Sequence, residues 1–217
     1  MYKDMDELFS NWKKRQEEEE GCRTLPKGAK KEVFHEDGFL TPGARQADVL
    51  FILKEAHNME EEEFWFREVV RSHGACDNNT KYYEKLKGIY QIITGSDELE
   101  KAAYMNINKR GGGVATNRAI LDNYACEYKE FIEQEIKLIN PKYVISMGVH
   151  DIIMRRIVFK TGKGERGKIK PEIWPAYKDN ETGIRYIGMN HPATPKYRNA
   201  EKYIEYFREI WETVQEM

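Results

Sequence analysis

The sequence predicts an α/β fold: a three-layer α/β/α sandwich around a four-stranded, mainly parallel sheet. Four short apolar runs are typical of strands buried on both faces of a parallel sheet. Helical patterns separate these runs, and the alternation of strands with helices favours a parallel sheet covered on both sides. A chain of 217 residues is long enough for one such core. We therefore expect a single domain over residues 1–217, with residues 1–45 forming an N-terminal helix and an extension packed on it.

The first element is a helix, because Met5, Leu8, Phe9 and Trp12 recur at helical spacing between charged residues. A run of four glutamates followed by Gly21 ends this helix. The four strands are predicted at residues 48–53 (DVLFIL), 103–107 (AYMNI), 143–147 (YVISM) and 185–189 (RYIGM).

The predicted helices lie between and after these strands. Residues 64–70 and 82–93 carry helical patterns, and a further helix covers residues 127–139. It ends at Asn140, because the residue before a proline avoids the α region. The closing helix is expected over residues 204–214. Its apolar stripe consists of Ile204, Phe207, Trp211 and Val214.

Composition narrows the class of protein. Hydrophobic residues make up 40% of the chain and charged residues 33%, against usual values of about 45–50% and about 25%, so a compact core and a charged surface are expected. No apolar run is long enough for a membrane span and no signal-peptide pattern is present, which favours a cytoplasmic protein. The net charge of −2 gives no general reason for nucleic-acid binding, which would need a local basic patch.

One segment provides such a patch. Residues 151–170 contain seven lysines and arginines against two acidic residues. This segment is either a solvated loop with glycines or a contact for nucleic acid, and the sequence leaves both interpretations open. In the second interpretation, Arg166 and Lys168 would contact DNA phosphates.

The cysteines predict neither a disulfide framework nor a metal centre. Cys22, Cys76 and Cys126 are odd in number and show no C-x-x-C spacing. We expect no metal and no cofactor.

Polar side chains follow each predicted strand. Ligands of open parallel α/β sheets bind at the carboxyl ends of the strands, so these residues are candidates for a site. They comprise Lys54-Glu55-Ala56-His57-Asn58 after the first strand, Asn106 and Lys109 at the end of the second, Gly148 after the third, and His191-Pro192 after the fourth. A carboxylate, amides and a histidine on one edge predict a binding or active site.

In order and spacing these segments resemble the uracil-DNA glycosylase superfamily. The resemblance rests on the Glu55-Ala56 turn, on Asn106-x-x-Lys109, on residues 125–148 (ACEYKEFIEQEIKLINPKYVISMG) and on His191-Pro192. It is closest to the thermostable bacterial and archaeal enzymes whose first motif reads Gly-Glu-Ala-Pro-Gly. It implies a uracil-DNA glycosylase-like fold and hydrolysis of the N-glycosidic bond of uracil or another damaged base in DNA, single- or double-stranded.

The resemblance also implies roles for individual residues. Asn106 would read the polar edge of the base, and His191 would donate to the base as it leaves with negative charge. Glu55 would orient the attacking water or stabilise the positive sugar, with Asn58 as a further water ligand. Substrate contacts are expected from Lys109 and from Trp65 or Phe66, on which the base would stack. DNA contacts are expected from Lys196 and Arg198.

The sequence departs from the family at two points. The first motif has Lys54 and His57 where the family keeps small residues, and only Cys126 matches a cluster cysteine, since Arg110 replaces another. Two alternatives therefore stay open. One is a protein of the same fold that binds nucleic acid or a nucleotide without hydrolysing it. The other is an unrelated α/β enzyme with the turn at residues 111–113 as a phosphate cradle. The aromatic residues 64–66 have a simpler interpretation as core.

Overall fold

A computed structural model of the chain describes residues 2–21, 23–56, 65–75, 79–112, 116–159 and 176–216, without the side chain of Trp65. Within these residues the protein has an α/β fold with one mixed, six-stranded sheet in the order β1-β3-β2-β4-β6-β5. The α/β class is therefore confirmed, and the expected number of four strands is corrected to six.

The four predicted strands form the centre of the sheet. They are β2 (Val49–Glu55), β3 (Ala103–Asn108), β4 (Tyr143–Met147) and β6 (Arg185–Met189). All three pairings among them are parallel. The edges are the short strands β1 (Gly38–Phe39) and β5 (Ala176–Lys178), which pair antiparallel with β3 and β6. These edge strands have too few residues to produce a periodic pattern, which is why the sequence did not predict them.

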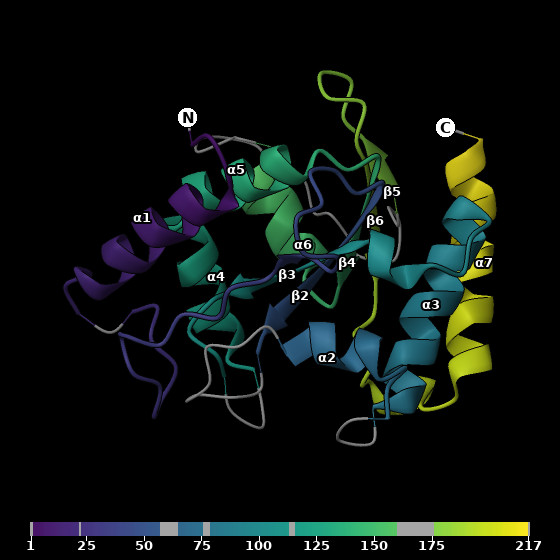
Figure 1. The fold of residues 1–217 in the computed structure, drawn as a ribbon, viewed down its shortest axis with the longest axis horizontal. Coiled ribbons are helices and arrows are strands. Elements are labelled where there is room, and N and C mark those ends of the chain that lie inside the picture. The colour runs from purple at the N-terminus through teal and green to yellow at the C-terminus, as the bar shows by residue number, and fades with distance from the viewer. Residues whose placement is uncertain are drawn as a thin grey trace.

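Helices cover both faces of the sheet (Figure 1). One face packs against α1 (Met5–Glu17), α4 (Arg118–Glu127), α5 (Lys129–Ile139) and α6 (His150–Ile153), with the π-helix η3 (Met154–Val158) following α6. The other face packs against α2 (Trp65–Arg71), α3 (Thr80–Thr94) and α7 (Ala200–Gln215). Two short 3-10 helices, η2 (Leu99–Lys101) and η4 (Pro195–Tyr197), lie in the connections. Two apolar cores result, one on each side of the sheet.

Local sequence signals fix the helix ends. Asp4 caps α1 by accepting from the Glu7 N–H, Asn117 caps α4, and Asn199 caps α7. Asn140 ends α5 in the left-handed conformation, at the position predicted from the following proline. The segment predicted as one helix from residue 127 is preceded by a separate helix, α4, and the two meet at Tyr128.

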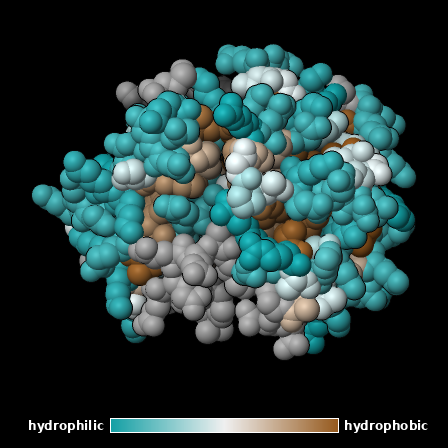
Figure 2. Space-filling view, viewed as in Figure 1, coloured by the Kyte–Doolittle hydropathy of each residue, from teal (hydrophilic) through white to brown (hydrophobic). Residues whose placement is uncertain are grey.

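The coloured residues on one face of the molecule are mostly hydrophilic (Figure 2). Figure 2 shows hydrophilic residues over most of one face, with hydrophobic residues visible only in gaps between them. Among the described residues, no helix has the length and apolar character needed to cross a membrane.

Candidate functional site

The carboxyl ends of the central strands bring several predicted site residues to one edge of the sheet. Glu55 is the last residue of β2 and pairs in register with Asn108, whereas Asn106 pairs with Leu53. His191 follows the end of β6 by two residues. Because β2 and β4 separate β3 from β6, the outer two backbones lie about 14 Å apart at about 4.8 Å per strand. Asn106 and His191 therefore flank this edge, and Glu55 lies between them.

Asn106 has a buried amide with spare hydrogen-bonding capacity. It is 6% exposed, and its Oδ1 atom has no hydrogen-bond partner among the described residues. Its side chain hydrogen-bonds to the Tyr104 phenol, on the same face of β3. A buried acceptor without a partner is costly, typically about 1–3 kcal/mol. The Asn106 oxygen is therefore available to accept a hydrogen bond from a ligand N–H.

The backbone at Asn106 is held by an acidic side chain from the N-terminal extension. Asp37 Oδ2 accepts a 2.6 Å hydrogen bond from the Asn106 N–H. Since β1 contains only two residues, the carboxylate provides the partner that a longer edge strand would supply. Asp37 is itself buried, and so it fixes the backbone from which the Asn106 side chain projects.

Lys109 is not brought to this site. Its fully buried ammonium contacts Asp37 Oδ1 and lies 2.9 Å from Glu135 Oε2. The rings of Phe9 and Trp12 lie 5.4 and 5.0 Å from the nitrogen. Strand alternation explains this placement, because residues three positions apart on an extended chain point to opposite faces. Lys109 therefore belongs to a structural ion cluster under α1, and its predicted contact with substrate finds no support in this geometry.

Glu55 is a confined carboxyl group. Its Oε2 atom is buried and has no hydrogen-bond partner among the described residues, while the side chain hydrogen-bonds to Thr116. Burial raises the pKa of Glu55 above its usual value, and the Thr116 hydrogen bond and the charge of Lys54 oppose that rise only in part. Gly112 leaves room for this carboxyl, and its N–H donates to the Ala56 carbonyl at 2.6 Å.

We predict that Gly112→Ala destabilises the protein by about 1–3 kcal/mol, as overpacking of a buried site does. A Cβ at this position would lie 2.2 Å from Cγ and 2.8 Å from Oε1 of Glu55. Urea unfolding of Gly112→Ala, Glu55→Ala and the double variant measures the effect. Removal of the Glu55 side chain should relieve most of the cost. An equal cost of Gly112→Ala in both backgrounds would contradict the proposed collision.

His191 is held as a neutral imidazole with a defined tautomer. The Ala193 N–H donates to its Nδ1 atom at 3.2 Å, so that nitrogen carries no proton and Nε2–H is the donor. Burial, followed by the charges of Lys54 and Lys85, lowers the pKa of His191 to about 4. At neutral pH the ring therefore presents a neutral N–H.

The two flanks of the edge are linked through the first turns of α3. The Tyr82 hydroxyl lies 3.4 Å from that of Tyr104, the partner of Asn106. One turn further, Lys85 Nζ donates to the Pro192 carbonyl at 2.6 Å. Tyr104, which hydrogen-bonds to Asn106, and the loop at His191 thus contact the same helix, and Asn106 and this loop lie on the same side of the sheet.

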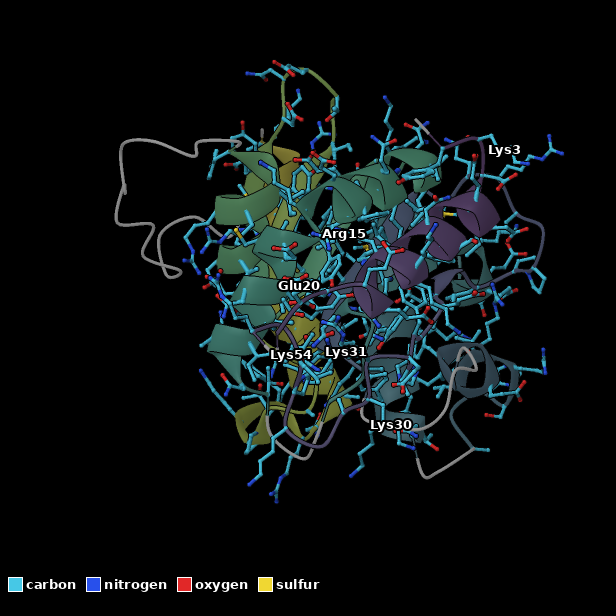
Figure 3. The ribbon with its side chains drawn as sticks, turned by 90° about the vertical axis from the view of Figure 1, so that its left-hand side faces the viewer. Lys3, Arg15, Glu20, Lys30, Lys31 and Lys54 are labelled. Atoms are coloured by element: carbon cyan, nitrogen blue, oxygen red, sulfur yellow. The ribbon has the colours of Figure 1, made fainter. Side chains whose placement is uncertain are left out.

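Lys54 adds a positive charge between the flanks. A Cβ on Gly148, which follows β4, would lie 3.2 Å from Lys54 Cε and 3.0 Å from His191 Cβ. Lys54 is half-buried, and Figure 3 labels it. Gly148 has a φ of +74° and its carbonyl accepts from Arg118 at 2.8 Å. The positive φ and the close neighbours both favour glycine at this turn.

Phe66 is a core residue in this structure. It is 1% exposed, stacks on Tyr104 at 4.2 Å and meets Tyr82 edge-on at 5.7 Å. This agrees with the simpler interpretation of the aromatic run, and a base could reach Phe66 only if the side chains over it moved. The Trp65 side chain lies outside the described residues.

The remaining predicted contacts have different outcomes. Lys196 and Arg198 are exposed on the segment that follows His191, and Lys196 Nζ lies 5.3 Å from the Tyr197 ring. Asn58 and the adjacent His57 lie outside the described residues, as do Arg166 and Lys168.

Two arginines at the start of the basic segment are already engaged. Arg156 pairs with Asp122 at 2.5 Å, and Arg155 lies 3.3 Å from both Asp122 and Asp151. Any excess positive charge of the segment therefore comes from residues beyond these two.

The described residues contain no group of three or more histidine, cysteine, aspartate or glutamate side chains arranged to hold a metal ion. Cys126 is exposed with a free thiol, and Cys22 and Cys76 lie outside the described residues. The expectation that the protein binds no cofactor stays a prediction.

Sequence reasoning missed the residues that support the site. Lys85 carried a signal, because it falls on the apolar stripe of α3 together with Leu86 and Ile89. A lysine in such a position is either snorkelling or bound to a specific partner. Asp37 and Tyr203 carried no comparable signal.

In comparisons with known proteins, no family model and no curated protein matches the chain.

Proposed function

We propose that the protein is a DNA N-glycosylase that cleaves the N-glycosidic bond of uracil or another damaged base, on a uracil-DNA glycosylase-like fold. One observation carries the proposal: a neutral histidine donor and an unsatisfied buried amide flank the same sheet edge. His191 offers Nε2–H, and Asn106 offers Oδ1. A base extruded from DNA needs such groups, because its polar edge loses its pairing partner.

The chemistry follows from where charge develops. As the glycosidic bond breaks, the base gains negative charge and the sugar gains positive charge. A neutral imidazole N–H stabilises the first charge without placing a cation in the ground state, and thus favours the transition state over the substrate. Glu55, at the end of the neighbouring strand, would face the sugar in its ionised form and orient water. Asn106 would select the base through an amide that both donates and accepts.

A second candidate is binding of nucleic acid or a nucleotide without hydrolysis. Lys54 favours it, because this side chain packs against Gly148 beside His191, where its positive charge would attract a phosphate and would oppose positive charge on a sugar. The third alternative, a phosphate cradle at residues 111–113, loses support. The Gly112 N–H is already bound to the Ala56 carbonyl, and the Glu55 carboxyl group lies against this glycine.

Release of a base from labelled oligonucleotides tests the proposal. Single- and double-stranded DNA containing uracil, hypoxanthine, xanthine or hydroxymethyluracil is incubated with the protein and then treated with alkali, which cleaves at abasic sites. Cleavage of at least one substrate supports the glycosylase. Binding without release from any of them would replace it with the binding function.

We predict that Lys196→Gln and Arg198→Gln together weaken DNA binding equally for all sequences. Both residues are exposed after His191, where phosphates would pass. The slope of log affinity against log salt should fall by about 0.7–0.9 for each phosphate that the protein no longer neutralises. Fluorescence anisotropy at several salt concentrations measures it. Lys137→Gln is the matched control, because this exposed lysine lies in the last turn of α5, which leads to the opposite edge of the sheet. An equal effect in the control would indicate non-specific charge attraction.

A further inference from the structure

The carbonyl groups on both sides of His191 are held by side chains from two helices. Lys85 on α3 donates to the Pro192 carbonyl at 2.6 Å. Tyr203 on α7 donates to the Asn190 carbonyl at 2.5 Å. Together with the Ala193 N–H on Nδ1, these contacts fix the backbone and the ring of His191.

The two clamping side chains are rigidly supported. Lys85 is 4% exposed and Tyr203 is fully buried, and the ammonium lies 5.5 Å from the centre of the tyrosine ring. Their helices approach closely at Gly88, where a Cβ would lie 2.3 Å from Ile204 Cδ1. Lys85 and Tyr203, which we call the clamp, are therefore part of the packing between α3 and α7 and do not form a surface contact.

Burying a charged lysine to hold one backbone carbonyl has a large desolvation cost. Burial lowers the pKa of Lys85, and no carboxylate among the described residues forms an ion pair with it. A neutral donor would make the same hydrogen bond at a smaller desolvation cost. The charge itself therefore needs an explanation. The contact with Pro192 brings it to the residue next to His191, whose pKa is lowered first by burial, then by Lys54 and then by Lys85.

We propose that Lys85 and Tyr203 are positioning residues for His191: they hold the carbonyl groups on both sides of it, and Lys85 places a positive charge on the residue that follows it. The inference rests on the proposed function for its catalytic consequence. Its structural part concerns His191 alone and applies whether or not the protein releases a base.

The test is an NMR titration of His191 in the full chain, without substrate. Lys85→Met removes both the charge and the donor, and the pKa of His191 should rise above its value of about 4, while burial and Lys54 still hold it below 6.5. Lys85→Arg keeps both features and should leave the value low. Lys87→Met is the control on the same helix, because Lys87 pairs with Asp97 at 3.2 Å. An unchanged His191 pKa in folded Lys85→Met would overturn the electrostatic part of the proposal.

Tyr203→Phe tests the clamp separately, since it removes one hydroxyl and no charge. If the protein releases a base, kcat should fall by about 10–100-fold with KM nearly unchanged, as expected for a misplaced catalytic group. Its His191 pKa should stay near 4. An unchanged kcat would overturn the clamp.

Should Lys85→Met fail to fold, Lys85→Gln retains a donor, removes the charge and gives the same titration test. If no substrate is cleaved, the titration still tests the electrostatic part of the proposal. The NMR shifts of the His191 ring nitrogens in Tyr203→Phe then test the clamp: displaced shifts support it, and unchanged shifts overturn it.

Discussion

If the protein is the proposed glycosylase, substitution of His191 by alanine should reduce the rate of base release by about 100- to 1,000-fold. Removal of one preorganised donor that meets charge developing in the transition state typically costs this much. The structure gives His191 this character, because Nδ1 accepts from Ala193 and Nε2–H is left to donate. Single-turnover kinetics with excess protein measures the effect: the maximal single-turnover rate should change far more than the protein concentration that gives half of it.

The Asn106→Ala variant is compared with His191→Ala, because the two residues are proposed to have different roles. Asn106 would read the base in the ground state as well as in the transition state, so its loss should reduce discrimination between bases more than the rate on the best one. Urea unfolding of both variants controls for folding defects. Equal, small losses in both variants would contradict the division of roles.

The second large effect is expected at Lys109. Lys109→Ala should lower the free energy of unfolding by about 3–5 kcal/mol, because it leaves the buried Asp37 carboxylate without its cation and removes the group that the Glu135 carboxyl contacts. A domain of this kind is stable by only about 5–15 kcal/mol, so the loss should be obvious in urea unfolding. Tryptophan fluorescence provides the signal; one of the four tryptophans is Trp12, whose ring lies 5.0 Å from Lys109 Nζ.

Glu135→Gln is the matched control. Burial, together with the neighbouring charge of Asp37, raises the pKa of Glu135 well above its ordinary value of 4.5. The folded protein therefore keeps a proton that the unfolded chain releases above about pH 4.5, and Glu135 makes wild-type stability fall as pH rises. Glutamine removes this dependence.

The stability of Glu135→Gln relative to wild type should consequently increase with pH. The expected slope is about 1.4 kcal/mol per pH unit between 4.5 and the raised pKa of Glu135. A loss of stability equal to that of Lys109→Ala at neutral pH would contradict a neutral Glu135.

Local patterns in the sequence predicted the centre of the fold well. The run at residues 48–53 became β2, because strands buried on both faces are apolar throughout, and the strand continues to Glu55. The Asn140 stop and the apolar stripe of α7 are equally local signals.

Residues that act across the fold could not be predicted in the same way. The family resemblance implies a substrate contact for Lys109, but strand alternation points this side chain into a buried ion cluster on the other face of the sheet. Asp37 supports Asn106 from 69 positions away, and Lys85 reaches Pro192 over 107. Such contacts follow from the packing of α3 and of the N-terminal extension, which no short pattern encodes.

The central claim is that Asn106 and His191 serve one base between them. A crystal structure of the protein soaked with uracil tests it most directly. We predict that the base binds at the carboxyl edge, with its N3–H and O4 side towards the Asn106 amide and another oxygen within hydrogen-bond distance of His191 Nε2. Uracil bound elsewhere, or an edge that stays empty at saturating uracil, would contradict the claim.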